Sequence, residues 1–177
     1  MRNFDADFDL AVSSITDSDS VSATNLTDVQ NLSGVNIRFG RLYIENSFGP
    51  ETENLPQAFK TQYYDGNTFV INTDDQCSTY NVSKMSLSNI SLAPTLKIGS
   101  TGNFVNGETN KLEITAPGAG NMGEMGVTYN SFDWLKYDWS NNDSLGNGPF
   151  TENPSSIATF GLFRGNDRII SWREVGN

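Results

Sequence analysis

The spacing of apolar residues constrains this fold more than any other feature, because it follows strands and not helices. No stretch of twelve residues carries apolar side chains at i, i+3, i+4 and i+7, the pattern of an amphipathic helix. Short apolar runs bounded by Gly, Pro, Asn and Asp recur along the chain instead. We therefore predict an all-β fold, an antiparallel β-sandwich with Greek-key-like connections. A division into two β lobes near residues 90–110 remains an alternative.

Turn residues place the strands of the first half. Residues 4–15 alternate loosely and predict a first strand, and residues 16–34 form a polar loop, so we assign 1–34 to an N-terminal strand and loop and 35–177 to the main β domain. A strand is predicted over 35–46. The pair Asp65-Gly66 predicts a hairpin with a type I′ turn between residues 58–64 and 67–72.

Similar signals place the strands of the second half. Asn106-Gly107 predicts another hairpin turn. Further strands are predicted over residues 112–116 and 125–137, followed by a long polar loop over 138–155. The chain is predicted to close with a hairpin of residues 156–163 and 168–175.

Composition excludes several function classes. The net charge of −10 disfavours nucleic acid and anionic membrane surfaces as partners. The sequence contains no run of 18 apolar residues of the kind that spans a membrane. The chain has no His, which removes the commonest general base and imidazole metal sites. We therefore predict a non-enzymatic protein. A carbohydrate-active hydrolase that uses a carboxylate pair is the remaining enzymatic alternative.

The single cysteine, Cys77, excludes an internal disulfide, and we expect a buried or half-buried thiol there. Residues 1–10 lack the basic and apolar segments of a signal peptide. If the protein is exported, we expect this chain to be one part of a longer precursor.

Two stretches together resemble a known family. The first runs from Gly40-Arg41-Leu42 through Phe48-Gly49-Pro50 and Gln62-Tyr63-Tyr64 to Asn72-Thr73-Asp74-Asp75 and Cys77. The second comprises Trp134-Leu135, Tyr137-Asp138-Trp139 and the terminal segment from Ala158 to Glu174. Over residues 36–175 the chain resembles the C-terminal domain of MshQ-type proteins, which are linked to biogenesis of the mannose-sensitive haemagglutinin (MSHA) type IV pilus.

The resemblance implies a β-rich domain at the end of a large exported protein on the bacterial cell surface or pilus. We expect it to act in adhesion or ligand display, with a surface glycan or protein as the ligand. The alternative is a structural module that docks on pilus subunits through exposed sheet edges.

Aromatic and arginine side chains are the candidate ligand-binding residues. Aromatic rings stack on sugars, which makes Trp134, Tyr137, Trp139 and Trp172 candidates, with core packing as the alternative explanation. Because Trp134 to Trp139 do not alternate cleanly, we expect one of these aromatics to face outward or into a groove. Arg164 and Arg168 flank a turn that could recognise a ligand, or could simply close a hairpin.

One loop has the pattern of a calcium site. Asp138, Ser140, Asn142 and Asp143 present oxygen ligands at closely spaced positions, which suits calcium. Asp74-Asp75 is a second candidate. The alternative for both is ordinary turn chemistry without a metal.

Overall fold

The computed structural model describes residues 5–10, 16, 18–22, 32–141 and 150–162, of which residues 5–10 and 32–37 are described through their backbone only. Within these ranges the protein is all-β, and its only helical turns are two short 3-10 segments, η1 (Val82–Lys84) and η2 (Asp133–Leu135). The predicted fold class is confirmed.

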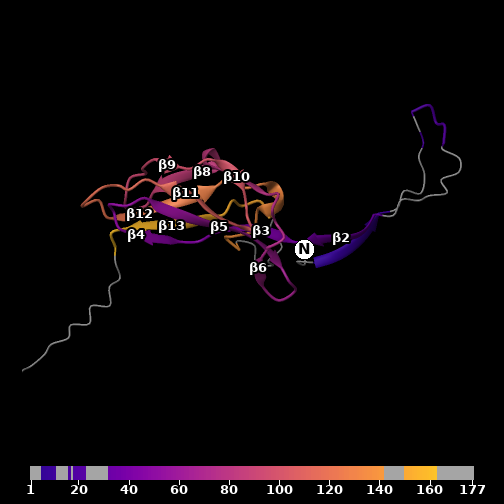
Figure 1. The fold of residues 1–177 in the computed structure, drawn as a ribbon, viewed down its shortest axis with the longest axis horizontal. Coiled ribbons are helices and arrows are strands. Elements are labelled where there is room, and N and C mark those ends of the chain that lie inside the picture. Colours follow the sequence, from indigo (N-terminus) through magenta and orange to yellow (C-terminus); the bar gives the residue numbers. More distant parts are fainter. Residues whose placement is uncertain (1–4, 11–15, 17, 23–31, 142–149, 163–177) are drawn as a thin grey trace, which may run out of the picture.

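Two sheets form the body of the molecule (Figure 1). The first sheet has the order β3-β5-β11-β9, with β6 also paired to β5, and its strands are β3 (Gly40–Ile44), β5 (Leu55–Tyr64), β6 (Phe69–Ile71), β9 (Lys97–Ile98) and β11 (Glu108–Ile114). The second sheet has the order β4-β13-β12-β8, and its strands are β4 (Ser47–Gly49), β8 (Met85–Asn89), β12 (Gly123–Tyr129) and β13 (Ser155–Phe160). Each sheet contains strands from before residue 90 and strands from after residue 107, and the buried core draws on both.

Two small ribbons lie outside these sheets. β7 (Thr79–Asn81) pairs with β10 (Thr101–Asn103), and β1 (Asp5–Leu10) pairs with β2 (Leu32–Arg38). The β1–β2 ribbon extends away from the sandwich in Figure 1. Every ladder between described strands is antiparallel except that of β4 and β13.

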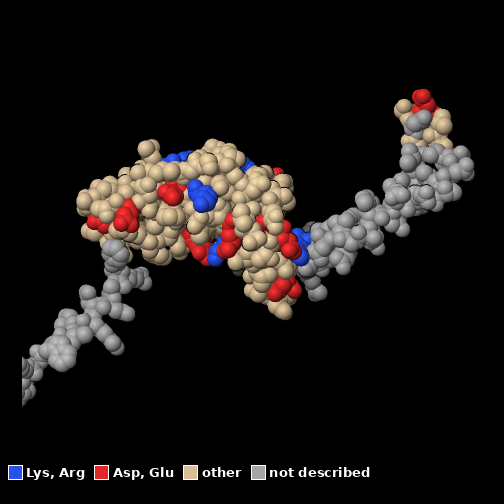
Figure 2. All heavy atoms as spheres, viewed as in Figure 1, with Lys and Arg blue, Asp and Glu red and all other residues tan. Residues whose placement is uncertain are grey.

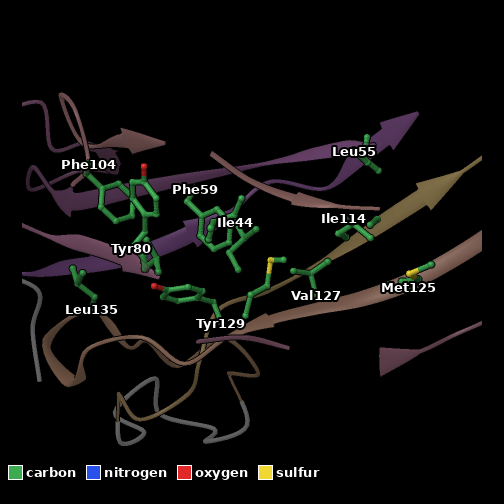
Figure 3. Close-up of a cluster of buried hydrophobic side chains, with 14 of the residues drawn as sticks. Ile44, Leu55, Phe59, Tyr80, Phe104, Ile114, Met125, Val127, Tyr129 and Leu135 are labelled. Carbon is green, nitrogen blue, oxygen red and sulfur yellow. The ribbon is translucent and has the colours of Figure 1, made fainter. Parts of the chain in front are cut away.

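The core lies between the two sheets because each long strand alternates buried and half-exposed residues, the period of a strand with one face covered. Phe59 of β5 is 1% exposed and meets Tyr129 of β12 edge-on, with 5.1 Å between ring centroids. Figure 3 shows these rings near Ile44, with Val127 and then Met125 farther along the core. Tyr80 and Phe104 close one end of the core with a second edge-on pair.

The hairpin turns differ from the prediction in one detail. The β5–β6 hairpin forms where predicted, but only Gly66 has a positive φ, so its turn is not type I′. Asp65 accepts hydrogen bonds from the amides of Asn67 and Thr68, and these contacts stabilise a longer loop. At Asn106-Gly107 both residues have positive φ, and the predicted tight turn is confirmed.

The predicted strand over 125–137 is wrong beyond Tyr129. Residues after Tyr129 leave the sheet, and η2 follows, where Lys136 pairs with Asp133 at 2.8 Å. β13 matches the predicted strand 156–163 in its first part, but β12 and β4 pair with its two edges. The predicted partner strand 168–175 lies outside the described residues.

Candidate functional site

A cavity of about 470 Å³ opens at one end of the first sheet and is the candidate binding site. Its size falls within the range of small-ligand pockets. We call it the Trp134 cavity; its lining comprises Arg38, Gly40, Gln62, Tyr63, Asn72, Asp74, Asp75, Cys77, Ser78, Trp134 and Leu135. Four segments far apart in sequence therefore meet here: the β2–β3 junction, the end of β5, the loop after β6, and η2.

Trp134 stands at this cavity with 68% of its surface exposed. The neighbouring Leu135 is 7% exposed and anchors η2 in the core. The Trp134 ring stacks on Phe132 with 4.6 Å between centroids and an interplanar angle of 8°. Lys84 Nζ lies 3.9 Å from the Phe132 centroid. Trp134 is thus an outward-facing aromatic of the kind expected from the sequence, and it is supported from one side by a stacked ring.

Arg38 supplies a fixed cation in the lining. Its Nη1 donates to Asn72 Oδ1 at 2.9 Å and to Asp74 Oδ2 at 2.7 Å. Its guanidinium also lies over the Tyr63 ring, 4.3 Å from the centroid. These three contacts hold the planar guanidinium beside the Asp74 carboxylate, and both groups line the same cavity as Trp134.

The Asn72–Ser78 loop is organised by Asp75, which is 7% exposed. Its carboxylate accepts hydrogen bonds from the amides of Cys77 at 3.3 Å and Ser78 at 2.9 Å. Burial is the largest influence and raises the pKa of Asp75, but hydrogen bonds from Ser78, Thr61 and Cys77 together outweigh it and lower the pKa below its usual value. Asp75 therefore acts as a buried, ionised acceptor that shapes the loop, and its oxygens are already engaged by protein donors.

Asp75 should make the fold sensitive to acid. Because its folded-state pKa lies below the unfolded value of about 3.9, its stabilising contribution is complete above that pH and is lost as the pH falls through the folded-state pKa. We expect the unfolding free energy of the native chain to fall more steeply below about pH 4 than that of Asp75→Asn. Urea unfolding of both proteins from pH 7 to pH 2.5 measures the difference. Parallel curves would contradict it.

Tyr137 and Trp139, the other described aromatic candidates, belong to a separate cluster around Arg41 on the outer face of the first sheet. The Arg41 guanidinium lies 3.7 Å from the centroid of Phe69, 4.9 Å from Trp139 and 5.0 Å from Tyr137. Burial lowers the pKa of Arg41, partly offset by Tyr137 and Tyr43. The rings pack against one another and against this cation, so they tie the segment after η2 to the sheet and do not line the Trp134 cavity.

Arg41→Met should lower the free energy of unfolding by about 1–2 kcal/mol, since it keeps the apolar stem but removes the cation from its rings. It also removes the hydrogen bond from Arg41 Nε to Gln62 Oε1 at 2.9 Å. Chemical denaturation checks this prediction. The matched variant Lys111→Met, at an exposed position of β11, should stay within about 0.5 kcal/mol of the native protein. Equal effects of the two variants would argue against a structural role of the cluster.

The remaining sequence candidates do not meet at the Trp134 cavity. Trp172, Arg164, Arg168, Asn142 and Asp143 lie outside the described residues. Asp138 is buried, and Ser140 is hydrogen-bonded to Glu152, with Oγ 2.5 Å from Oε1 and the amide 2.7 Å from Oε2. Within the described ranges no three acidic or cysteine side chains gather as a metal site would require, and the Asp74–Asp75 pair serves Arg38 and its own loop.

A second cavity of about 370 Å³ bears on the hydrolase alternative, because Glu45 and Glu108 both line it. Lys60 Nζ lies 2.6 Å from Glu45 and 3.5 Å from Glu108, and the hydrogen bond with Glu45 is the main cause of its raised pKa. Both carboxylates pair with the same ammonium group, whereas a glycosidase uses one carboxyl group as an acid and the other as a base or nucleophile. The arrangement is that of a surface ion network.

Sequence reasoning missed most of the Trp134 cavity. Arg38, Tyr63 and Asn72 were not candidates, and Asp74 was considered only for metal binding. Cys77 is exposed in the cavity lining, contrary to the expected buried or half-buried thiol, because the interior of the loop is occupied by the Asp75 carboxylate, which accepts a hydrogen bond from the Cys77 amide. Arg38 and Asp74 are 36 positions apart, and no local signal joins them.

One face of the protein carries charges of both signs. On the face shown in Figure 2, acidic and basic groups are interspersed and no broad basic area is visible.

In the part of the chain that the structure describes, no helix is long and apolar enough to cross a membrane.

Comparison with known proteins places this fold in a family. Neither a curated protein nor a solved structure matches the chain significantly. A family model described as DUF6701, fourth domain, matches residues 38–175, which include both sheets of the sandwich and the whole lining of the Trp134 cavity. The match begins at Arg38, the last residue of β2, and leaves residues 1–37 outside, with β1 and the rest of β2 among them. The chain therefore belongs to the DUF6701 family, as its fourth domain.

Proposed function

We propose that this domain is a non-enzymatic adhesion or ligand-display module, and that it binds a surface glycan in the Trp134 cavity. The observation that carries the proposal is Trp134 itself, 68% exposed beside a cavity of about 470 Å³ that also presents fixed polar groups. Apolar rings flanked by a few convergent polar groups are the usual composition of small-ligand sites. The likeness to MshQ-type proteins supports an exported, pilus-associated setting at the bacterial cell surface.

Binding to a glycan array tests the proposal. We expect Trp134→Ala to weaken binding of the best glycan at least tenfold, about 1.4 kcal/mol, because the ring supplies the stacking surface. Phe48→Ala is the matched control, since Phe48 of β4 is 69% exposed but lies outside the cavity. The control should bind like the native protein. Unchanged binding by Trp134→Ala would refute the assignment of the site.

The array should be run once with calcium and once with a chelator. The proposal expects the same binding in both, because Arg38 is hydrogen-bonded to Asp74 and Asn72, and among the described residues no three acidic or cysteine side chains gather in a way that could hold a metal ion. Binding only with calcium would move the site to the loop that contains Asp138 and Ser140.

A second candidate function is a pilus assembly module, favoured by the outer face of the second sheet. Phe48, Ile157 and Ile90 are 69%, 37% and 51% exposed there. Ile157 pairs with Gly126, and a Cβ at Gly126 would lie 3.7 Å from Ile90, so these two apolar residues are close. Phe48 pairs with Thr159, two residues along β13 from Ile157. Cross-linking to pilin subunits that is lost in Phe48→Asp but retained in Trp134→Ala would favour assembly over adhesion.

A further inference from the structure

We propose that the Trp134 cavity selects an uncharged sugar ring with neighbouring hydroxyl groups and rejects sugars that carry a carboxylate, such as sialic or uronic acids. This inference rests on the proposed function and narrows its ligand to one chemical class. It is carried by the charges of the lining and by the way that each of them is already paired.

The lining offers an acidic sugar no basic side chain that lacks an acidic partner. Its one basic side chain is Arg38, against the two acids Asp74 and Asp75. Arg38 Nη1 already donates to Asp74 at 2.7 Å and to Asn72 at 2.9 Å. A sugar carboxylate at Arg38 would share the guanidinium with Asp74 and would lie near two protein carboxylates, which would repel it.

The lysines that contact the residues around Trp134 do not change this balance. Lys136 is paired with Asp133, with 2.8 Å between Nζ and Oδ1. Lys84 lies against the Phe132 ring, and Nζ is 3.9 Å from its centroid. Neither residue lines the cavity, so the local field at the ligand is set by Arg38 and the two aspartates.

The polar groups of the lining suit hydroxyl groups well. A sugar hydroxyl both donates and accepts, so two adjacent hydroxyls can pair with a carboxylate and a neighbouring donor at once. The Asp74 side chain is 73% exposed and holds one oxygen on Arg38, which leaves its carboxylate accessible to such a pair. The exposed Trp134 ring can then cover the apolar C–H face of the same sugar.

The test compares neutral glycans with their acidic counterparts, for example galactose-terminated chains with and without a sialic acid cap, and glucose with glucuronic acid. Dissociation constants are measured on the full chain at about 0.05 M and about 0.5 M salt. Screening of an unfavourable charge is weak at the lower concentration and strong at the higher one. We expect the neutral member of each pair to bind at least tenfold tighter at low salt. The preference should shrink at high salt.

Asp74→Asn should narrow the preference for neutral sugars at least threefold, because it removes one of the two carboxylates that repel an acidic ligand. Asp133→Asn is the matched control: Asp133 is exposed and paired with Lys136 outside the cavity, so the preference should not change. Equal or tighter binding of the acidic member, lost in Trp134→Ala, would overturn this inference but keep the proposed function. Failure of every glycan to bind would overturn both.

Discussion

Phe59→Ala should lower the free energy of unfolding by about 3–5 kcal/mol, the largest effect expected of any single substitution considered for this domain. Phe59 is 1% exposed on β5, a strand paired with β3, β6 and β11, and its ring meets Tyr129 across the sandwich. Truncation would leave a cavity at the junction of the two sheets. It would also loosen Tyr129, whose hydroxyl accepts a hydrogen bond from the Asn81 amide at 3.0 Å.

Urea unfolding followed by circular dichroism measures the loss. Domains of this size are stable by about 5–15 kcal/mol, so Phe59→Ala should have a much lower midpoint and could be partly unfolded without urea. Phe48→Ala, which removes the same side chain from a site 69% exposed, should change stability by less than about 0.5 kcal/mol. Similar losses in the two variants would mean that Phe59 is not at the centre of the core.

Gly107→Ala should cost about 2–5 kcal/mol, from the strain of a side chain at positive φ and from a steric clash. Gly107 has φ +76°, and an added Cβ would overlap the carbonyl of Asn72 and lie 3.1 Å from Thr61 Oγ1. Its own amide donates to Asp75 O at 3.0 Å, and its carbonyl accepts from the Thr61 amide at 2.8 Å. The glycine therefore joins β5 to the Asn72–Ser78 loop, which lines part of the Trp134 cavity.

Gly66→Ala is the matched control, because Gly66 has φ +105° but a Cβ there would meet nothing within 4 Å. This control should cost only the conformational strain, about 1–2 kcal/mol. Thermal and urea unfolding of both variants measure the difference, which isolates the clash with Asn72. A Gly107→Ala variant as stable as Gly66→Ala would show that the loop can shift away from the turn.

Much of the sandwich could be predicted from the sequence because strand alternation and turn residues are local signals. The alternation within β5 and β12 and the pair Asn106-Gly107 gave the strand positions and a tight turn. The type of the β5–β6 turn was predicted wrongly because Asp65 uses its side chain to satisfy backbone amides, an option that competes with the type I′ conformation.

Contacts between distant segments could not be predicted in the same way. The parallel pairing of β4 and β13 joins three-residue stretches about 110 positions apart, and one supporting hydrogen bond runs from the Ile157 amide to Asn46 Oδ1 at 2.9 Å. The same limit applies to the candidate site. The sequence marks Trp134 as an aromatic residue outside the strand alternation. Arg38 and Asp74, which share the cavity with it, come together only because β6 turns back beside β5.

The aromatic residues near η2 illustrate why residue type alone does not define a site. Trp134, Tyr137 and Trp139 are close in sequence, yet the 3-10 turn at η2 separates them. Trp134 faces the cavity, whereas Tyr137 and Trp139 pack with their rings 5.2 Å apart around Arg41. The 3-10 turn therefore sets the directions of these side chains, and direction distinguishes Trp134, the binding candidate, from the two packing residues.

Alkylation of Cys77 is the measurement that tests the central claim most directly, because the only cysteine of the chain is exposed in the lining of the Trp134 cavity. The rate of modification by a maleimide is followed with and without a saturating concentration of the best neutral glycan. A ligand seated in the cavity should slow the reaction at least fivefold in the native protein, and the same glycan concentration should give little protection in Trp134→Ala. Full-rate alkylation of the native protein while the glycan is demonstrably bound would place the binding site elsewhere and contradict the account.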